Sequence, residues 1–188
     1  MRRLERCSSN IGGQERVIET SRLLLRLPEP ADARALMEIH QDPVVVAEGL
    51  VTATAPPGGI DVALQVIDSM LRHWKRHNYG RWSVVERATN EVNGCVGFFH
   101  RDGESDIEIS WIIRRLHWGN GFATEAARAA IDWAWTATTT GHIVSVIRKD
   151  DARSMRVAEK SGQRFERDVI DPPSGRTYSI FGIHRPES

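Results

Sequence analysis

The hydrophobic positions of this chain alternate between the spacing of strands and the spacing of helices. The leucine-rich run 22–27 predicts a first strand, and Pro30 suits the first turn of a helix that Pro43 is expected to stop. Apolar residues at helical spacing over 60–79 predict a second helix, closed by Gly80. The remaining pattern predicts strands at about 81–86, 94–100 and 106–113, a helix at 121–138, a strand at 142–147, a helix at 151–161, and strands near 164–170 and 176–183. This order, βααβββαβαββ, is typical of an α+β protein whose sheet is mixed and mostly antiparallel.

Turn signals and polar ends outline the domain. Asn93-Gly94 and Asp102-Gly103 are hairpin signals, so the three strands between residues 81 and 113 are expected to form an antiparallel meander. Residues 1–16 are polar and aperiodic, and we interpret them as a flexible N-terminal leader. Residues 17–186 then form a single domain, which a chain of 188 residues is long enough to support.

Composition narrows the class of protein. The 25 basic and 25 acidic residues cancel, which argues against a general nucleic-acid binder because such proteins carry a net basic footprint. No apolar stretch is long enough to span a membrane, and no apolar core follows Arg2 and Arg3 as a secretory signal would require. Cys7 and Cys95 are too isolated for a metal motif or a disulfide framework. We therefore expect a cytoplasmic protein.

The run Trp118-Gly-Asn-Gly-Phe-Ala-Thr-Glu-Ala126 is the most informative stretch of the chain. It follows a predicted strand and leads into a long amphipathic helix. Glycines let a backbone approach a ligand closely, and the first turn of a helix offers unpaired N–H groups and a positive dipole end. The run therefore predicts a phosphate site. The preceding meander, rather than a βαβ unit, argues against a dinucleotide fold.

Four segments together resemble the GNAT superfamily of acetyl-coenzyme A-dependent N-acetyltransferases, and within it the Rim-type ribosomal-protein N-terminal acetyltransferases. They are Glu19–Arg26, residues 32–43 (Asp32-Ala33 and Gln41-Asp42-Pro43), Trp118–Ala126 and Ser154–Gly162, and the resemblance covers about residues 17 to 184. The chain departs from the family pattern at Leu116, Asp151 and Gln163, where relatives commonly have Gln or Arg, Asn, and Phe.

The resemblance implies a GNAT-like sheet flanked by helices and transfer of acetyl from acetyl-CoA to an amine. It implies a coenzyme site in three parts, which are the strand residues Ile112, Ile113 and Arg114, the loop residues Trp118, Gly119, Asn120, Gly121, Phe122, Ala123 and Thr124, and the later residue Asp151. Arg114, Arg115 and Lys149 could meet phosphates, although solvated side chains are the alternative. No metal is implied.

Two residues are candidates for proton transfer. Glu108 lies in Glu-Ile-Ser-Trp where Rim-type relatives resemble Glu-Leu-Gly-Tyr, which makes it the candidate base; the alternative is a solvated glutamate or an arginine partner. Strand alternation places Glu108 on the face opposite Trp111. Ser154, by its place in the later-helix motif, is the candidate acid toward the leaving thiolate. The alternative for Ser154 is a purely structural role, as a serine in the first turn of the helix that Asp151 caps.

Some other side chains invite functional interpretations. His73 and His77 stand at i and i+4, a spacing that can bind zinc, although a solvated basic helix face is the simpler interpretation. Trp74 and Trp82 flank the region where this family's acceptor groove lies, so a groove or a core role stays open for both.

The sequence thus predicts an N-acetyltransferase whose acceptor is a protein N-terminus or a small amine. The mostly apolar segment 44–59 favours a peptide or an amphipathic amine. Two alternatives remain, a coenzyme-binding module without turnover and a transferase of a longer acyl group. Dimers are frequent in such families, so the resemblance leaves monomer and homodimer open.

Overall fold

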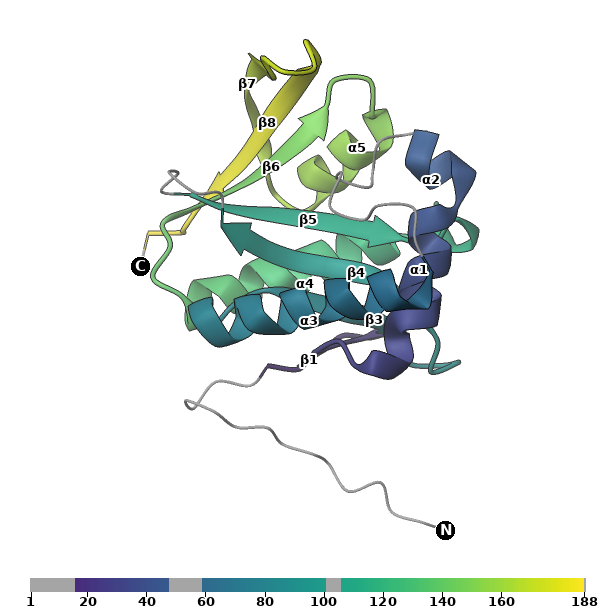
Figure 1. Ribbon diagram of the computed structural model, residues 1–188. Helices are drawn as coiled ribbons and strands as arrows, with labels where there is room; N and C mark the ends of the chain where they lie inside the picture. Colours follow the sequence, from purple (N-terminus) through teal and green to yellow (C-terminus); the bar gives the residue numbers. More distant parts are fainter. Residues whose placement is uncertain (1–15, 48–58, 101–105, 188) are drawn as a thin grey trace.

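One eight-stranded sheet organises the molecule, as Figure 1 shows. The computed structural model describes residues 16–47, 59–100 and 106–187. The strands are β1 (Ile18–Glu19), β2 (Leu23–Arg26), β3 (Arg81–Glu86), β4 (Val92–His100), β5 (Ile107–Ile113), β6 (His142–Arg148), β7 (Arg164–Ile170) and β8 (Thr177–His184). Their spatial order is β1-β2-β3-β4-β5-β6-β8-β7. Only the β5–β6 pairing is parallel, so the predicted α+β fold with a mixed, mostly antiparallel sheet is confirmed.

Helices cover both faces of this sheet (Figure 1). They are α1 (Ala33–Gln41), α2 (Pro43–Ala47), α3 (Ile60–His77), α4 (Phe122–Ala137) and α5 (Ala152–Lys160), with short 3-10 turns η1 (Pro30–Asp32) and η2 (Arg115–His117). In Figure 1, α3 lies in front of the sheet and α4 behind it. None of the helices in the described part of the chain has the length and apolar character that a membrane crossing requires.

The alternation of β5 divides its side chains between two cores. Ile107 and Ile109 pack on the α4 side, in a cluster with Ala126, Ala130 and other α4 residues. Ile112 packs on the opposite side, against residues of α1 and α3. The predicted alternation of this strand is therefore confirmed, and Glu108 shares the α1/α3 face with Ile112.

One predicted hairpin turn is wrong. Asn93 and Gly94 lie inside β4, and the turn between β3 and β4 occurs at residues 87–90, where Asn90 adopts a φ of 60°. A Cβ at Gly94 would lie 2.1 Å from the backbone oxygen of Ile112. The glycine therefore permits a close strand approach rather than a turn. The second signal, Asp102-Gly103, lies outside the described residues.

Two short elements were not predicted from the sequence. The predicted stop of the first helix before Pro43 is confirmed, because α1 ends at Gln41, but Pro43 also begins the short helix α2, since proline is tolerated at a first helical position. A two-residue strand, β1, precedes the predicted first strand. Of the predicted leader 1–16, only Arg16 is described, and its carbonyl accepts a hydrogen bond from the Trp82 indole at 2.9 Å.

A buried ion pair ties α1 to the sheet. Asp32 is 2% exposed and accepts hydrogen bonds from the Arg26 guanidinium at 2.7 and 2.8 Å and from the Ser83 hydroxyl at 2.6 Å. Burial alone would raise the pKa of the Asp32 carboxyl, but the Arg26 and Ser83 hydrogen bonds outweigh it and lower this pKa. The carboxylate is thus more stable in the folded protein than in the unfolded chain.

We expect Asp32→Asn to lower the free energy of unfolding at pH 7 by about 2 kcal/mol, because it leaves the half-buried Arg26 charge without its carboxylate. Since the folded-state pKa is lowered, the stabilisation is fully present above about pH 5 and is lost as pH falls through the folded pKa. Urea denaturation at pH 7 and pH 3.5 measures both effects.

Asp68→Asn is the matched control, because Asp68 pairs with Arg72 on the exposed face of α3. It should change stability little at either pH. A difference between wild type and Asp32→Asn that does not narrow on acidification would show that the carboxylate charge is not what stabilises this contact.

Candidate functional site

The sheet opens between β5 and β6. Their pairing register comprises two residue pairs, Ile107 with Ile143 and Glu108 with Val144. Both strands continue well beyond these pairs, and Figure 1 shows them diverging from a common end. The Ile109 carbonyl accepts a hydrogen bond from the Ser145 hydroxyl at 3.3 Å. Backbone groups further along this edge of β5 are therefore available to a ligand that lies along the strand.

A glycine turn closes the far end of this opening. Gly119 and Gly121 have φ angles of 81° and 80°, in the left-handed region that glycine adopts without strain. Gly121 is the N-cap of α4. The Gly121 carbonyl accepts the first helical hydrogen bond, from the Glu125 N–H at 3.0 Å. The N–H groups of Phe122, Ala123 and Thr124 precede that bond and point out of the helix start. This end of α4 is suited to an anion.

A cavity of about 360 Å³ lies in front of this helix start, and we call it the α4 cavity. Ten of the predicted site residues line it: Ile112, Ile113, Trp118, Gly119, Gly121, Phe122, Ala123, Thr124, Asp151 and Ser154. The structure therefore brings together segments from β5, the glycine turn and α5. Arg114, Asn120 and Glu108 are not among the lining residues.

Three basic residues of α5 line the same cavity, and sequence reasoning missed them. They are Arg153, Arg156 and Lys160, which follow one another at helical spacing. The guanidinium of Arg153 lies 4.0 Å from the centre of the Trp118 ring. Their i, i+3, i+7 spacing was the signal available in the sequence, because these positions share one face of a helix.

The arginines and the lysine that were predicted to meet phosphates are engaged elsewhere. Arg115 pairs with Asp42 at 2.9 Å, Arg114 approaches Glu38 at 3.5 Å, and Lys149 pairs with Asp168 at 2.5 Å. The positively charged side chains that line the cavity therefore come from α5 (Arg153, Arg156 and Lys160) and not from the end of β5. We call these three residues the cationic rim.

Asp151 is the helix cap of α5. Its Oδ1 accepts a hydrogen bond from the Ser154 N–H at 3.0 Å, and the residue is 4% exposed. This satisfies one of the first N–H groups of α5. The Ser154 hydroxyl belongs to the half-buried wall of the α4 cavity. The cap uses the backbone N–H of Ser154 and not its hydroxyl, so the capping role and a chemical role are compatible.

Glu108 lies at the closed end of the opening, in the second pair of the β5–β6 register. It is 6% exposed and is also paired in register with Phe99 of β4. Ile112, which lines the α4 cavity, lies four positions further along β5, a distance of about 13 Å along the strand. A ligand held at the cavity has to extend along β5 to reach it.

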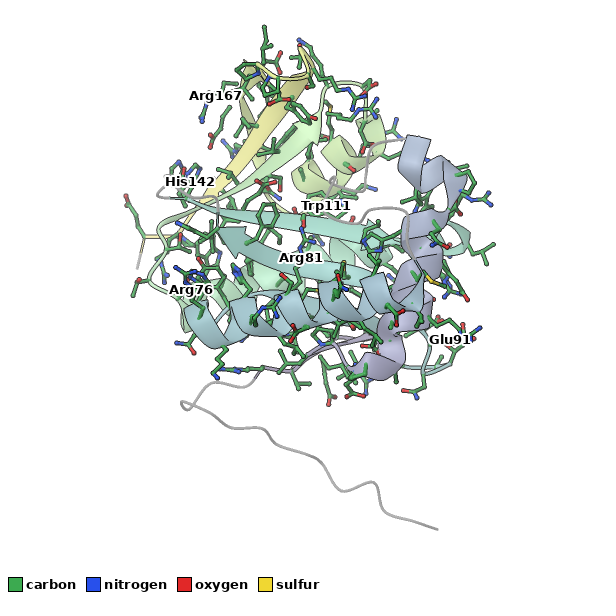
Figure 2. The ribbon with its side chains drawn as sticks, viewed as in Figure 1. Arg76, Arg81, Glu91, Trp111, His142 and Arg167 are labelled. Carbon is green, nitrogen blue, oxygen red and sulfur yellow. The ribbon has the colours of Figure 1, made fainter. Side chains whose placement is uncertain are left out.

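Imidazoles and aromatic rings gather beside this closed end. The rings of His73 and His77 lie 4.4 Å apart, and the His73 ring lies 5.5 Å from that of Tyr79. Burial, followed by the charges of His77 and Arg81, lowers the pKa of His73 to about 4, so this ring is neutral at pH 7. Figure 2 labels Arg81, whose guanidinium lies 5.0 Å from the centre of the Phe99 ring.

The tryptophans whose role the sequence left open belong to the core. Trp74 and Trp82 are 1% and 0% exposed, and their rings pack edge to face with centroids 4.8 Å apart. Trp133 of α4 completes the group at 4.9 Å from Trp82. A direct role in an acceptor groove is excluded for both by their burial.

Comparison with known proteins agrees with this geometry. Residues 22–164 match the family described as Acetyltransferase (GNAT) domain. The chain is 30% identical over 139 residues to the uncharacterized N-acetyltransferase p20 of Bacillus licheniformis, a match that covers 73% of this chain and 76% of that protein. It is 32% identical over 100 residues to the uncharacterized protein YkkB of Bacillus subtilis (strain 168), where it spans only 58% of the relative's length and 52% of its own.

Solved structures share the fold. A GNAT-family acetyltransferase from Bacillus anthracis superposes with a TM-score of 0.77 at 22% identity, covering 91% of this chain and 99% of that one. The ribosomal-protein-S5-alanine acetyltransferase from Vibrio fischeri also superposes with a TM-score of 0.77, at 14% identity, covering 91% and 97%. The chain belongs to the GNAT acetyltransferase family and is an N-acetyltransferase of that family.

Proposed function

We propose that this protein moves an acetyl group from acetyl-CoA to a primary amine, with the coenzyme phosphates at the α4 cavity and the thioester along β5. The observation that carries the proposal is the alignment of three features: the left-handed glycine turn, the helix start behind it, and the unpaired edge of β5 that leads away from it. A long, phosphorylated thioester carrier fits this arrangement at both ends.

The phosphate end combines backbone and side-chain donors. The N–H groups at the start of α4 supply a fixed positive dipole, and Arg153, Arg156 and Lys160 supply mobile positive charge from across the cavity. Gly119 and Gly121 keep this surface free of side chains, which lets a pyrophosphate approach the backbone. Asn120 belongs to the same turn, although its side chain is not part of the cavity wall.

The arm of the carrier would run along β5. Ile112 and Ile113 contribute apolar wall to the cavity, and the β5 backbone up to Arg114 offers hydrogen-bonding groups on its open edge. The Trp118 indole donates to the Ile113 carbonyl at 2.7 Å, which marks where this edge begins. Trp111 also lines the cavity, and it packs against the α4-side core and against a cluster of Ile147, Ala158 and Phe181.

Proton transfer falls to Glu108 and Ser154. A protonated amine is not a nucleophile, so its proton must leave before it attacks the thioester carbonyl, and Glu108 lies where an arm along β5 would place the thioester. The leaving thiolate comes from a thiol of pKa about 8.5 and needs only weak assistance, which the Ser154 hydroxyl can give. The coenzyme supplies the activated acetyl group, while these side chains move the protons.

The acceptor side favours a peptide N-terminus or an amphipathic amine over a polycation. Arg81, His73 and His77 lie near the closed end of the opening. The Arg81 guanidinium beside Phe99 would disfavour a second or third cationic group on the acceptor. The Vibrio fischeri neighbour acts, by its name, on a ribosomal-protein alanine, which agrees with a peptide acceptor. The apolar segment 44–59, on which the sequence-based preference rested, lies largely outside the described residues.

A carboxylate behind the loop holds it in place. Glu125 Oε1 accepts hydrogen bonds from the Thr20 hydroxyl at 2.6 Å and the Arg22 N–H at 3.0 Å, and Oε2 pairs with the Arg22 guanidinium at 2.6 Å. Arg22 also donates to the Asn120 carbonyl at 2.8 Å. Burial alone would raise the pKa of the Glu125 carboxyl, but the Thr20 and Arg22 hydrogen bonds together lower it. A permanent anion therefore anchors the turn to the start of β2.

The direct test combines acetyl-CoA with a panel of peptides and small amines and follows release of free thiol. Release above the hydrolysis background, with one acceptor class preferred, is expected. Binding of coenzyme without release for any acceptor would favour a binding module, and faster release from longer acyl-CoA esters would favour a longer acyl donor. Gly121→Glu, which adds a charge and a strained side chain at φ 80°, should abolish both binding and release.

We expect Glu125→Gln to weaken coenzyme binding about fivefold by calorimetry, because the amide loses the charge that pairs with Arg22 and the turn loosens. Asp132→Asn, an exposed acidic position on the same helix, should leave binding unchanged. Equal affinities for wild type and Glu125→Gln would mean that the anchor does not set the shape of the loop.

We expect Glu108→Gln to lower kcat about 100-fold at pH 7 with little change in coenzyme affinity, since it removes only the proton acceptor. The loss should shrink with an arylamine acceptor, which is already unprotonated at that pH. Glu91→Gln is the control and should leave kcat unchanged, because Glu91, labelled in Figure 2, is exposed. A wild-type rate in Glu108→Gln would exclude Glu108 as the base.

A further inference from the structure

A second cluster of chemically capable side chains lies at the closed end of the sheet, away from the α4 cavity. It consists of His142 at the start of β6, Glu166 of β7 and His184 at the end of β8. Each offers a nitrogen or carboxylate oxygen, and these atoms all lie within 4.8 Å of one another. We call this set the His-Glu-His cluster.

Strand register brings the three residues together. His142 and His184 are direct partners in the β6–β8 ladder, and their rings stack at 4.2 Å. The β7–β8 register shifts between Phe165 and Arg167, so Glu166 occupies a β-bulge. A bulge redirects one side chain out of the regular alternation, and here it turns Glu166 toward His142, with Oε1 at 2.8 Å from Nε2.

A missing side chain makes room for the carboxylate. Gly182 lies two residues before His184 in β8, and a Cβ on it would stand 1.9 Å from Glu166 Oε1 and 2.5 Å from His142 Nε2. Any other residue there would push Glu166 away. The bulge and the glycine thus act together to place one carboxylate beside two imidazoles.

Asp106 orients the central histidine. Its Oδ2 lies 3.1 Å from His142 Nδ1, on the opposite side of the ring from Glu166. Histidines that bind metals commonly donate their second N–H to a carboxylate in this way, which fixes the tautomer and leaves Nε2 free to coordinate. With Nδ1–H directed at Asp106, Nε2 faces Glu166, and zinc would replace the hydrogen bond that now joins Nε2 to Glu166 Oε1.

We propose that the His-Glu-His cluster binds a divalent zinc ion. Two imidazoles and one carboxylate are a donor set that suits Zn²⁺ better than Mg²⁺ or Ca²⁺, which prefer oxygen ligands alone. Three protein ligands leave the fourth position of a tetrahedral ion to water. The side chains of His142 and Glu166 are 17% and 24% exposed, so the ion has both access and partial shielding.

Small movements complete the site. Zinc with bonds of about 2.0–2.1 Å holds tetrahedral ligand atoms about 3.3 Å apart, so Glu166 Oε1 moves outward by roughly 0.5 Å from its hydrogen bond to His142. His184 turns out of the ring stack to aim a nitrogen at the ion. Both changes are confined to side chains at the edge of the sheet.

The ion would join three strands next to the β5–β6 junction. The three ligands come from β6, β7 and β8, and Asp106, which immediately precedes β5, contacts the ligand His142. Figure 2 labels His142 at the left end of the sheet, where β5 and β6 begin. The α4 cavity lies about 20 Å away at the other end of β5, whereas Glu108 stands only two residues along β5 from Asp106.

The experiment titrates ZnCl₂ into tag-free, chelator-stripped full-length protein by calorimetry and follows Tm with and without one equivalent of zinc. One ion per chain with a micromolar or tighter Kd is expected, together with a rise in Tm that EDTA reverses. Cobalt(II) replaces zinc in a parallel titration, where visible absorption bands of a four-coordinate ion are expected.

Three variants locate the ion. His184→Gln removes a ligand, Asp106→Asn removes the orienting carboxylate, and Gly182→Ala keeps every ligand but displaces Glu166. Each should weaken zinc binding at least tenfold. Gly182→Ala meets only the ends of side chains, so it should fold normally by circular dichroism. The double variant His73→Gln/His77→Gln is the control and should bind zinc as wild type does.

The proposal is overturned if wild type binds no zinc below millimolar concentration. It is equally overturned if binding survives in both His184→Gln and Gly182→Ala, or if the control variant loses it instead.

Discussion

The short parallel junction between β5 and β6 is the constraint on which the rest of the structure depends. Two residue pairs are enough to keep one continuous sheet, yet they leave most of β5 without a neighbour on that side. Extending the pairing would close the edge along which we propose that the carrier arm lies, and removing it would split the sheet into β1–β5 and β6–β8. Side-chain packing compensates for the missing ladder, because Trp111 of β5 packs both against the α4-side core and against a small cluster of Ile147, Ala158 and Phe181.

The remaining site features are arranged around that opening so that little has to move when a ligand binds. The turn already has its left-handed glycines, the helix dipole is fixed, and Glu125 holds the turn through an anion whose charge the fold favours. Groups that are fixed before binding lose little conformational entropy on binding. The mobile contributions come from the long side chains of α5.

The order of the elements and the position of the glycine turn could be predicted because both depend on residues that are close together in the sequence. Hydrophobic spacing defines strands and helices, and the glycines between a strand and a helix have a local conformational reason. The turn predicted at Asn93-Gly94 was wrong because a tight turn and a close contact between strands both require glycine. Only the nearby Ile112 backbone, which the sequence does not show, tells the two cases apart. The helix stop before Pro43 could be predicted, but the start of α2 at the same residue could not, because one proline can serve both roles.

The cationic rim could not be predicted from the sequence, because it depends on which long basic side chains pair with a carboxylate in the folded protein. Arg115 pairs with Asp42, whereas Arg153 stacks on Trp118. The loop anchor was equally hidden, because Thr20 and Arg22 reach Glu125 across 105 and 103 positions of sequence. That separation has a consequence for how the protein comes to be active. The hydrogen bonds bridge a segment that contains β2 to β5, so we expect the anchored turn, and any ligand affinity that depends on it, to form only after these four strands have paired.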